Sequence, residues 1–127
     1  MNGFSLYHKI CIDLSFPKHE SMESVDTIFA MATPPGQSAI AVIRISGPKA
    51  GLSPILFQAS CPAAGQFFLA RLRAGDQVID EAMILYMVAP KSSTGEDVCE
   101  IHCHGSTAVI DAILDKLAKT DGFRLAN

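Results

Sequence analysis

The residues best suited to chemistry in this chain lie in the segment 98–104, where apolar and ionisable residues alternate. An alternation with a period of two is typical of a β-strand that has one apolar face and one polar face. One face would carry Val98, Glu100, His102 and His104, and the other would carry Cys99, Ile101 and Cys103. A carboxylate and two imidazoles on one side of a strand could bind a metal ion, transfer protons or hold a polar ligand.

Metal binding and catalysis are the weaker of these alternatives. His102 and His104 could supply two zinc ligands, whereas a zinc site needs three or four. Glu100 and His102 could form an acid–base pair, but no serine or cysteine stands at a spacing that would make it an activated nucleophile. We therefore predict neither a metal ligand nor a catalytic residue.

Ligand binding gains support from Arg44, which interrupts the otherwise apolar segment 39–46. A buried arginine needs an anion, because an unpaired buried charge is very costly. The anion could be a structural ion-pair partner, or the head group could reach water; alternatively, the guanidinium could anchor a ligand carboxylate. A pocket that offers Arg44 and Glu100 would suit a pterin-like heterocycle with an acidic tail.

The elements that must position these residues follow from apolar runs and turn residues. We predict strands over 26–32, 39–46, 66–73, 78–80, 82–88 and 98–104, with 66–73 and 78–80 joined as a hairpin. A short helix should start near Pro48, weakened by Gly51 and Pro54. Strands and helices without a regular βαβ order favour an α+β fold, with a mixed β-sheet and helices packed on one face.

The final helix has the strongest pattern. Ser106 or Thr107 can cap its start, and Gly122 suits its C-terminal cap. Asp115 and Lys119 are spaced for an ion pair on its exposed side. Its apolar stripe consists of Val109, Ile110, Ile113, Leu114 and Leu117.

Composition limits the class of protein. With 127 residues, 49% hydrophobic and 18% charged, the chain is long enough for one packed domain. The net charge is −3 without a basic stripe, which argues against a direct nucleic-acid-binding patch. No apolar run approaches the roughly 20 residues of a membrane span, and no secretory signal is evident. Four cysteines without a disulfide spacing favour free thiols in a reducing, cytoplasmic environment.

Residues 1–25 differ from the rest and form a predicted N-terminal extension to a domain over 26–127. Ile10, Ile12, Leu14 and Phe16 alternate with polar or small residues, and Pro17 ends the pattern. The extension should be loose or an edge strand, and Met22 offers an alternative start.

Two blocks carry a family resemblance: DTIFAMATPPGQSAIAVIRISGPKA over 26–50 and IDEAMILYMVAPKSSTGEDVCEIHCHG over 79–105. With TPPG, IRISGP and TGEDV-EIHCHG in this order, the chain resembles the N-terminal domain of the tRNA-modification GTPases of the TrmE/MnmE type. The resemblance extends from Asp26 to the C-terminus and does not include the extension.

The resemblance implies a fold similar to the folate-binding domains of aminomethyltransferases, a bound 5-formyltetrahydrofolate as one-carbon donor, and a homodimer. It places Arg44 and Glu100 on folate-contacting positions. A GidA/MnmG-type flavoprotein and tRNA would be partners of the full-length protein, which modifies the wobble uridine. GTP, Mg²⁺ and K⁺ would belong to a GTPase domain, and the chain lacks the GxxxxGK[ST] motif of such a domain.

Three hypotheses about function follow. The domain could bind folate and dimerise without turnover of its own, it could be a structural dimerisation module that has lost its ligand, or it could be a small enzyme that uses Glu100 and His102. A C-terminally truncated domain should also expose apolar surface and self-associate.

Overall fold

The computed structural model describes residues 26–33 and 39–126. The predicted extension and residues 34–38, between the first two predicted strands, therefore lie outside the described residues. The elements in chain order are β1 (Thr27–Met31), β2 (Ile40–Ser46), the 3₁₀ helix η2 (Ala50–Phe57), β3 (Gln66–Ala74), β4 (Gln77–Met87), β5 (Val98–His104), α2 (Thr107–Ala118) and β6 (Phe123–Leu125).

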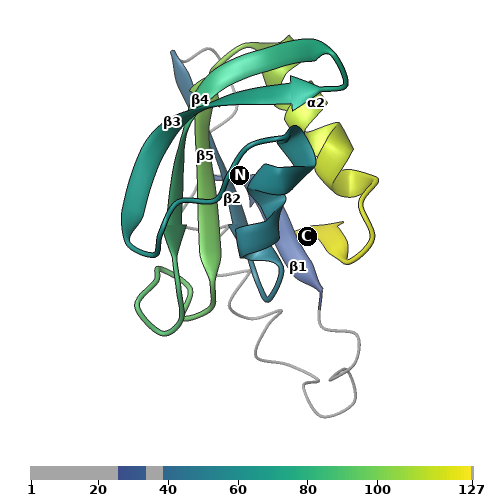
Figure 1. Ribbon diagram of the computed structural model, residues 1–127. Helices are drawn as coiled ribbons and strands as arrows, with labels where there is room; N and C mark the ends of the chain where they lie inside the picture. The colour runs from purple at the N-terminus through teal and green to yellow at the C-terminus, as the bar shows by residue number, and fades with distance from the viewer. Residues whose placement is uncertain (1–25, 34–38, 127) are drawn as a thin grey trace.

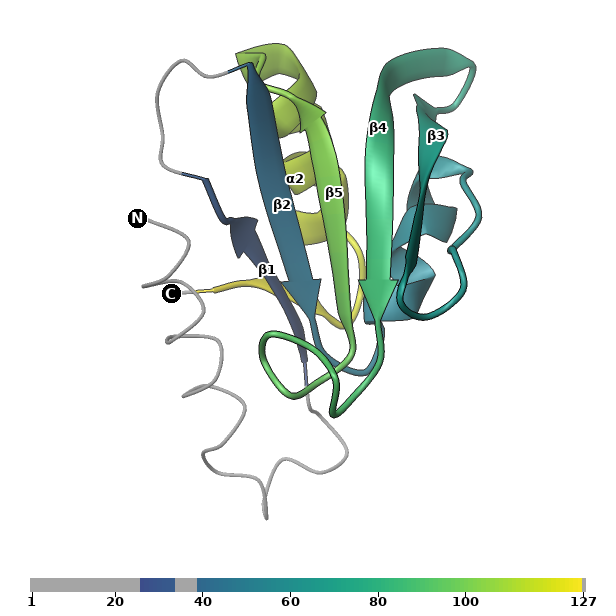
Figure 2. The same cartoon turned by 90° about the vertical axis from the view of Figure 1, so that its left-hand side faces the viewer.

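The described strands form one six-stranded sheet in the order β3-β4-β5-β2-β1-β6. Neighbouring strands are antiparallel except for β1 and β6, which run parallel. Both helices cover the same face of this sheet (Figures 1 and 2). The predicted mixed sheet with helices on one face is confirmed.

The main core lies between the sheet and the two helices, because the strand period turns one apolar set toward them. Ile43 of β2 and Ile101 of β5 are directly paired and fully buried there, beneath Ile113 and Leu117 of α2. A smaller cluster on the other side of the sheet, which we call the open face, contains Ile28, Ala30, Ala32, Ala126 and Val42.

The final helix forms as its pattern predicts. The Ser106 hydroxyl accepts a hydrogen bond from the Val109 N–H, so Ser106 is the N-cap. Lys119 donates to Asp115 at 2.9 Å in the predicted exposed pair. None of the helices in the described ranges is long and apolar enough to cross a membrane.

The predicted C-terminal cap is wrong. The helix ends at Ala118 with Lys119 as its cap, and Gly122 instead lies in the turn that leads into β6. There its carbonyl accepts a hydrogen bond from the Thr27 N–H at 2.9 Å. The strand β6 was not predicted, because three residues are too short to show a pattern and their partner strand stands at the other end of the chain.

Two other boundaries differ from prediction. The predicted segments 78–80 and 82–88 belong to one strand, β4. The polar residues at their junction can lie within a strand because both have partners: Glu81 pairs with Arg71, and Asp80 accepts hydrogen bonds from His104. The short helix begins at Ala50 and is a 3₁₀ helix, which fits the presence of Pro54 inside it.

Candidate ligand-binding site on the open sheet face

Arg44 and Glu100 meet at the centre of the sheet although 56 positions separate them in the chain. They stand directly opposite each other in the antiparallel register of β2 and β5, so both side chains project from the open face. The Arg44 Nε donates to Glu100 Oε2 at 2.8 Å. The expectation that the two charges share one side of the sheet is confirmed.

His102 completes what we call the polar triad, Arg44, Glu100 and His102. Its Nε2 lies 2.9 Å from Glu100 Oε1, and since an ionised carboxylate can only accept, Nε2 is the donor. The two residues are neighbours on the same face of β5 because they stand two positions apart in a strand. Both oxygens of Glu100 are therefore engaged from within the chain.

Burial makes the triad electrostatically unusual. The side chains of Arg44 and Glu100 are each only 10% exposed, whereas His102 is 35% exposed. Burial alone would raise the pKa of Glu100, but the His102 hydrogen bond and the Arg44 charge outweigh it and lower the pKa from 4.5 to about 2. Glu100 is thus an ionised hydrogen-bond acceptor at neutral pH.

Apolar side chains surround the triad on the open face. The strand registers place Ala30, Arg44, Glu100, Leu85 and Phe67 in one row across β1, β2, β5, β4 and β3. The neighbouring row runs through Val42, His102, Met83 and Leu69. A buried charge pair within an apolar sheet surface can orient a partly polar, partly aromatic ligand.

The turn before β5 is hydrogen-bonded to β2, and this contact fixes the position of the strand that carries Glu100. The Ser46 and Thr94 hydroxyls are 2.8 Å apart, and Asp97 Oδ1 accepts from the Ala89 N–H at 2.9 Å. Gly95 has φ 82, a backbone conformation that glycine adopts without strain. This glycine turn therefore positions the site.

A second histidine contact escaped sequence reasoning. Asp80 accepts from both the backbone N–H and Nδ1 of His104, with distances of 2.8 and 2.7 Å. The His104 side chain is 71% exposed. No spacing in the sequence predicts this contact, because the contact depends on how β4 aligns with the end of β5. It gives His104 a structural partner apart from the triad.

The thiols lie away from the triad. Cys99 and Cys103 are free and buried on the helix side, as their alternation predicts, and Cys61 is free as well. Burial raises the pKa of Cys99 to about 12 and that of Cys103 to about 11, so neither is a ready nucleophile. Cys11 lies outside the described residues. Within the described part of the chain, no group of three or more His, Cys, Asp or Glu is arranged to hold a metal ion.

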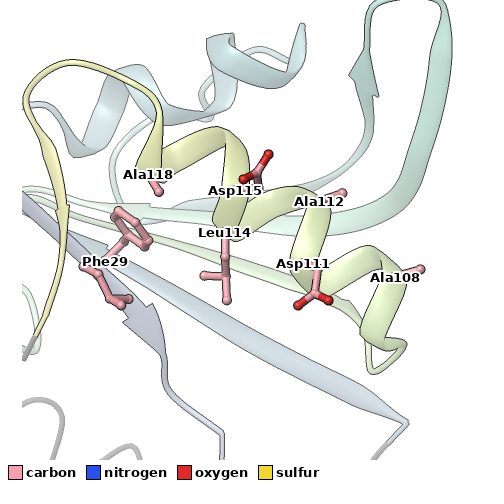
Figure 3. Close-up of a pocket in the computed structure, with 8 residues that line it drawn as sticks. Phe29, Ala108, Asp111, Ala112, Leu114, Asp115 and Ala118 are labelled. Atoms are coloured by element: carbon pink, nitrogen blue, oxygen red, sulfur yellow. The ribbon is translucent and has the colours of Figure 1, made fainter.

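A cavity lies elsewhere, on the helix side of the sheet. It has a volume of about 660 Å³ and is lined by Phe29, Leu125 and one flank of α2, including Leu114 and Ala118. Leu114 points from α2 toward the sheet beside Phe29 (Figure 3). The polar triad does not line this cavity, so any ligand of the triad would lie against the open face.

Comparison with known proteins places the chain in a family. The family model described as the GTP-binding protein TrmE N-terminus matches residues 27–127. The chain belongs to the TrmE N-terminal family. The matched residues start at Thr27, the first residue of β1, and they include Arg44, Glu100 and His102.

Relatives of this TrmE-type domain carry the name of a tRNA-modification enzyme. The chain is 45% identical over 103 residues to the tRNA modification GTPase MnmE of Dinoroseobacter shibae, covering 80% of the chain and 24% of that relative. It is 48% identical over 95 residues to MnmE of Ehrlichia chaffeensis, covering 73% and 22%. The mitochondrial tRNA modification GTPase mss1 of Schizosaccharomyces pombe is 40% identical over 101 residues, covering 78% and 20%. The chain thus spans about a quarter or less of these relatives' lengths.

Proposed function

We propose that this domain binds a reduced folate, 5-formyltetrahydrofolate, at the polar triad. In a protein of its relatives' length, it would serve as the folate-binding and dimerising part of a cytoplasmic tRNA-modification GTPase that acts on the wobble uridine with a flavoprotein partner. We also propose that this fold is similar to that of the folate-binding domains of aminomethyltransferases. One observation carries it: a hydrogen-bonded Arg–Glu pair set into the apolar open face.

The chemistry of the pair supports a pterin as ligand. Each carboxylate oxygen has two lone pairs, so Glu100 can accept further N–H donors besides those of Arg44 and His102. Its lowered pKa, about 2, keeps it an acceptor at neutral pH. The amino and ring N–H groups of a pterin are donors on one edge. Leu85 and Phe67, in the same row, offer apolar contacts for the ring faces.

Isothermal titration calorimetry of the chain with 5-formyltetrahydrofolate tests the proposal. We expect binding that weakens at least about tenfold in Arg44→Lys, because an ammonium keeps the charge but cannot reproduce the planar guanidinium. Arg71→Lys is the matched control, since the Arg71 side chain is 57% exposed in its pair with Glu81. Thermal melting of each variant verifies that it is folded.

Two results would count against folate binding: no heat at high micromolar protein, or equal affinity in the unchanged chain and Arg44→Lys. Weakening of the same size in the Arg71→Lys control would also contradict it, because that pair lies in β3 and β4 at the far edge of the sheet.

The second candidate function is a structural dimerisation module that has lost its ligand. It is favoured by the geometry of Glu100, whose two oxygens are already bonded to Arg44 and His102. Under this hypothesis, folate leaves the melting temperature of both the unchanged chain and Glu100→Gln unaltered, while sedimentation still shows a dimer. A folate-induced rise in melting temperature that is lost in Glu100→Gln would exclude it.

A further inference from the structure

The Glu100 carboxylate is held from two directions. Across the sheet, the Arg44 Nε of β2 donates to Oε2 at 2.8 Å, and along β5 the His102 Nε2 donates to Oε1 at 2.9 Å. The last torsion of a glutamate side chain has broad minima, so a single contact leaves the plane of the carboxylate poorly defined. A second contact, on the other oxygen, fixes that plane. His102 therefore adds orientation to a pair whose charges are already matched.

His102 also differs from the other two members of the triad in its exposure. The side chains of Arg44 and Glu100 are each 10% exposed, whereas that of His102 is 35% exposed. Removing Arg44 or Glu100 takes away the charge that faces the other, but removing His102 leaves the ion pair in place. His102 can therefore be varied while the buried pair that supports the fold is kept.

The neighbours of His102 across the sheet are apolar. The strand β5 lies between β2 and β4 (Figure 2), and the registers set Val42 on one side of His102 and Met83 on the other. An apolar side chain would fill this row as well as an imidazole does, so packing does not require a histidine here. The hydrogen bond to Glu100 is what an imidazole supplies and an apolar side chain cannot.

A second histidine on the same strand face has a different partner. His104 follows His102 by two positions, but its Nδ1 lies 2.7 Å from Asp80 Oδ1 and its side chain is 71% exposed. The two histidines thus share a strand, a face and a carboxylate contact, and they differ in which carboxylate they hold. His104 is therefore the matched control for His102.

The plane of the carboxylate matters for the ligand proposed above. The amino group and the ring N–H of a pterin lie side by side in the plane of the ring. Hydrogen bonds to an sp² oxygen prefer to lie near the plane of its group, so a carboxylate turned out of the pterin plane would weaken both contacts. The orientation that His102 gives to Glu100 therefore bears on pterin recognition.

We propose that His102 is a positioning residue of this site, whose Nε2–H fixes the plane of the Glu100 carboxylate so that it receives the adjacent amino and ring N–H donors of a reduced pterin. This inference rests on the proposed folate function and deepens it, because it gives a role to a side chain that need not touch the ligand. The effect of His102 on affinity passes through Glu100.

Isothermal titration calorimetry with 5-formyltetrahydrofolate tests the inference. His102→Met keeps a side chain of similar size without the donor, and affinity should fall at least about tenfold, because hydrogen bonds to charged groups are the stronger ones. His102→Gln carries an amide N–H that can reach Glu100, and it should bind within about threefold of the unchanged chain. His104→Met should bind as the unchanged chain does, because His104 contacts Asp80 instead.

A change of ligand separates positioning from a general loosening of the site. With the 2-desamino analogue of 5-formyltetrahydrofolate, the ligand lacks one of the two donors that the oriented carboxylate would receive. The loss caused by His102→Met should therefore be clearly smaller for the analogue than for 5-formyltetrahydrofolate. A merely structural role for His102 would weaken both ligands equally.

The orientation can also be measured without a ligand. Burial raises the pKa of Glu100, but the His102 hydrogen bond and the Arg44 charge outweigh it and lower the pKa to about 2. In a ¹³C NMR titration of the Glu100 carboxyl, His102→Met should raise this pKa, and His102→Gln should raise it less because an N–H donor remains. His104→Met should leave it unchanged.

Thermal melting verifies that each variant is folded. Should His102→Met not fold, His102→Asn takes its place, since the asparagine amide is polar but too short to reach Glu100 from this position. No heat with the unchanged chain would overturn the folate function and this inference together. Binding by the unchanged chain with equal affinity in His102→Met, no recovery in His102→Gln, equal losses for both ligands, or an unchanged Glu100 pKa in His102→Met would overturn the positioning role alone.

Discussion

At the scale of single residues, the structure explains how an apolar central strand holds an arginine. Arg44 is buried, yet Glu100 lies directly opposite in the sheet and accepts from its Nε at 2.8 Å. His102 satisfies the other carboxylate oxygen. Removing one partner of a buried ion pair takes away the counter-charge of the other partner. A substitution at one residue of the triad should therefore weaken the interactions of the other two.

Glu100→Gln should therefore destabilise the fold by about 3 kcal/mol at pH 7, since it removes the carboxylate charge that faces the buried Arg44 guanidinium. The pKa of Glu100 is lowered to about 2, so its contribution is present above pH 4.5 and is lost as pH falls toward 2. Urea unfolding from pH 7 to pH 2 should show the stability difference between the two proteins shrinking over that range.

Glu81→Gln is the control for this substitution. Glu81 also pairs with an arginine, but its side chain is 51% exposed, and exposed pairs are worth less than about 1 kcal/mol. A Glu81→Gln loss as large as that of Glu100→Gln, or a Glu100 effect that does not change with pH, would refute the electrostatic account.

At the scale of elements, the joint between β2 and η2 depends on a close approach. Gly47 has φ 138, and a Cβ at this position would lie 2.8 Å from the Thr27 Cα. Its N–H donates to the Asp97 carbonyl at 2.9 Å, which connects β2 to the turn before β5. The strand that carries Arg44 and the strand that carries Glu100 are thus fixed at the same point.

Gly47→Ala should cost about 3 kcal/mol or more, because the added methyl group meets backbone as well as an unfavourable φ. Gly75→Ala separates the two effects: Gly75 has φ 60, but a Cβ there meets nothing within 4 Å, so only about 1 kcal/mol should be lost. Equal losses in chemical denaturation would show that backbone conformation alone, rather than the contact with Thr27, explains the glycine.

The N-cap of α2 gives a smaller prediction at the same scale. Ser106→Ala should lower the free energy of unfolding by about 1 kcal/mol, because the Val109 N–H loses its acceptor. Ser60→Ala, at an exposed position in the loop after η2, should change it by less than about 0.5 kcal/mol. A neutral Ser106→Ala in thermal melts would show that the helix is held by packing alone.

At the scale of the whole molecule, the two sides of the sheet differ in what covers them. Both helices of the described residues pack on one side, whereas the open face exposes Ile40 by 56%, Phe67 by 64% and Leu69 by 61%. Exposed apolar side chains grouped on one face mark an interaction surface. The proposed homodimer would bury this face and would enclose the polar triad.

Leu69→Asp should therefore reduce self-association, because it places a charge on the open face beside Met83. Light scattering over a concentration series should show at least a tenfold weaker association than in the unchanged chain. Leu52→Asp serves as the control, since Leu52 is 52% exposed but lies on η2, on the other side of the sheet. A monomer at every concentration, or equal weakening in both variants, would contradict association through the open face.

The sequence by itself determined where β1 to β5 and the final helix run, and which face each residue shares with its near neighbours. These follow from local periodicity: Glu100 and His102 stand two positions apart in a strand, and Ile113 and Leu117 stand one turn apart in a helix. It also determined the family, because the blocks around Arg44 and Glu100 are contiguous in the chain.

Only the tertiary structure decided which distant residues meet. The register of β2 on β5 pairs Arg44 with Glu100, the alignment of β4 brings Asp80 to His104, and β6 exists only because β1 offers it a partner. Hydrogen-bond register between strands depends on how the whole sheet packs against its helices, and no local spacing encodes it.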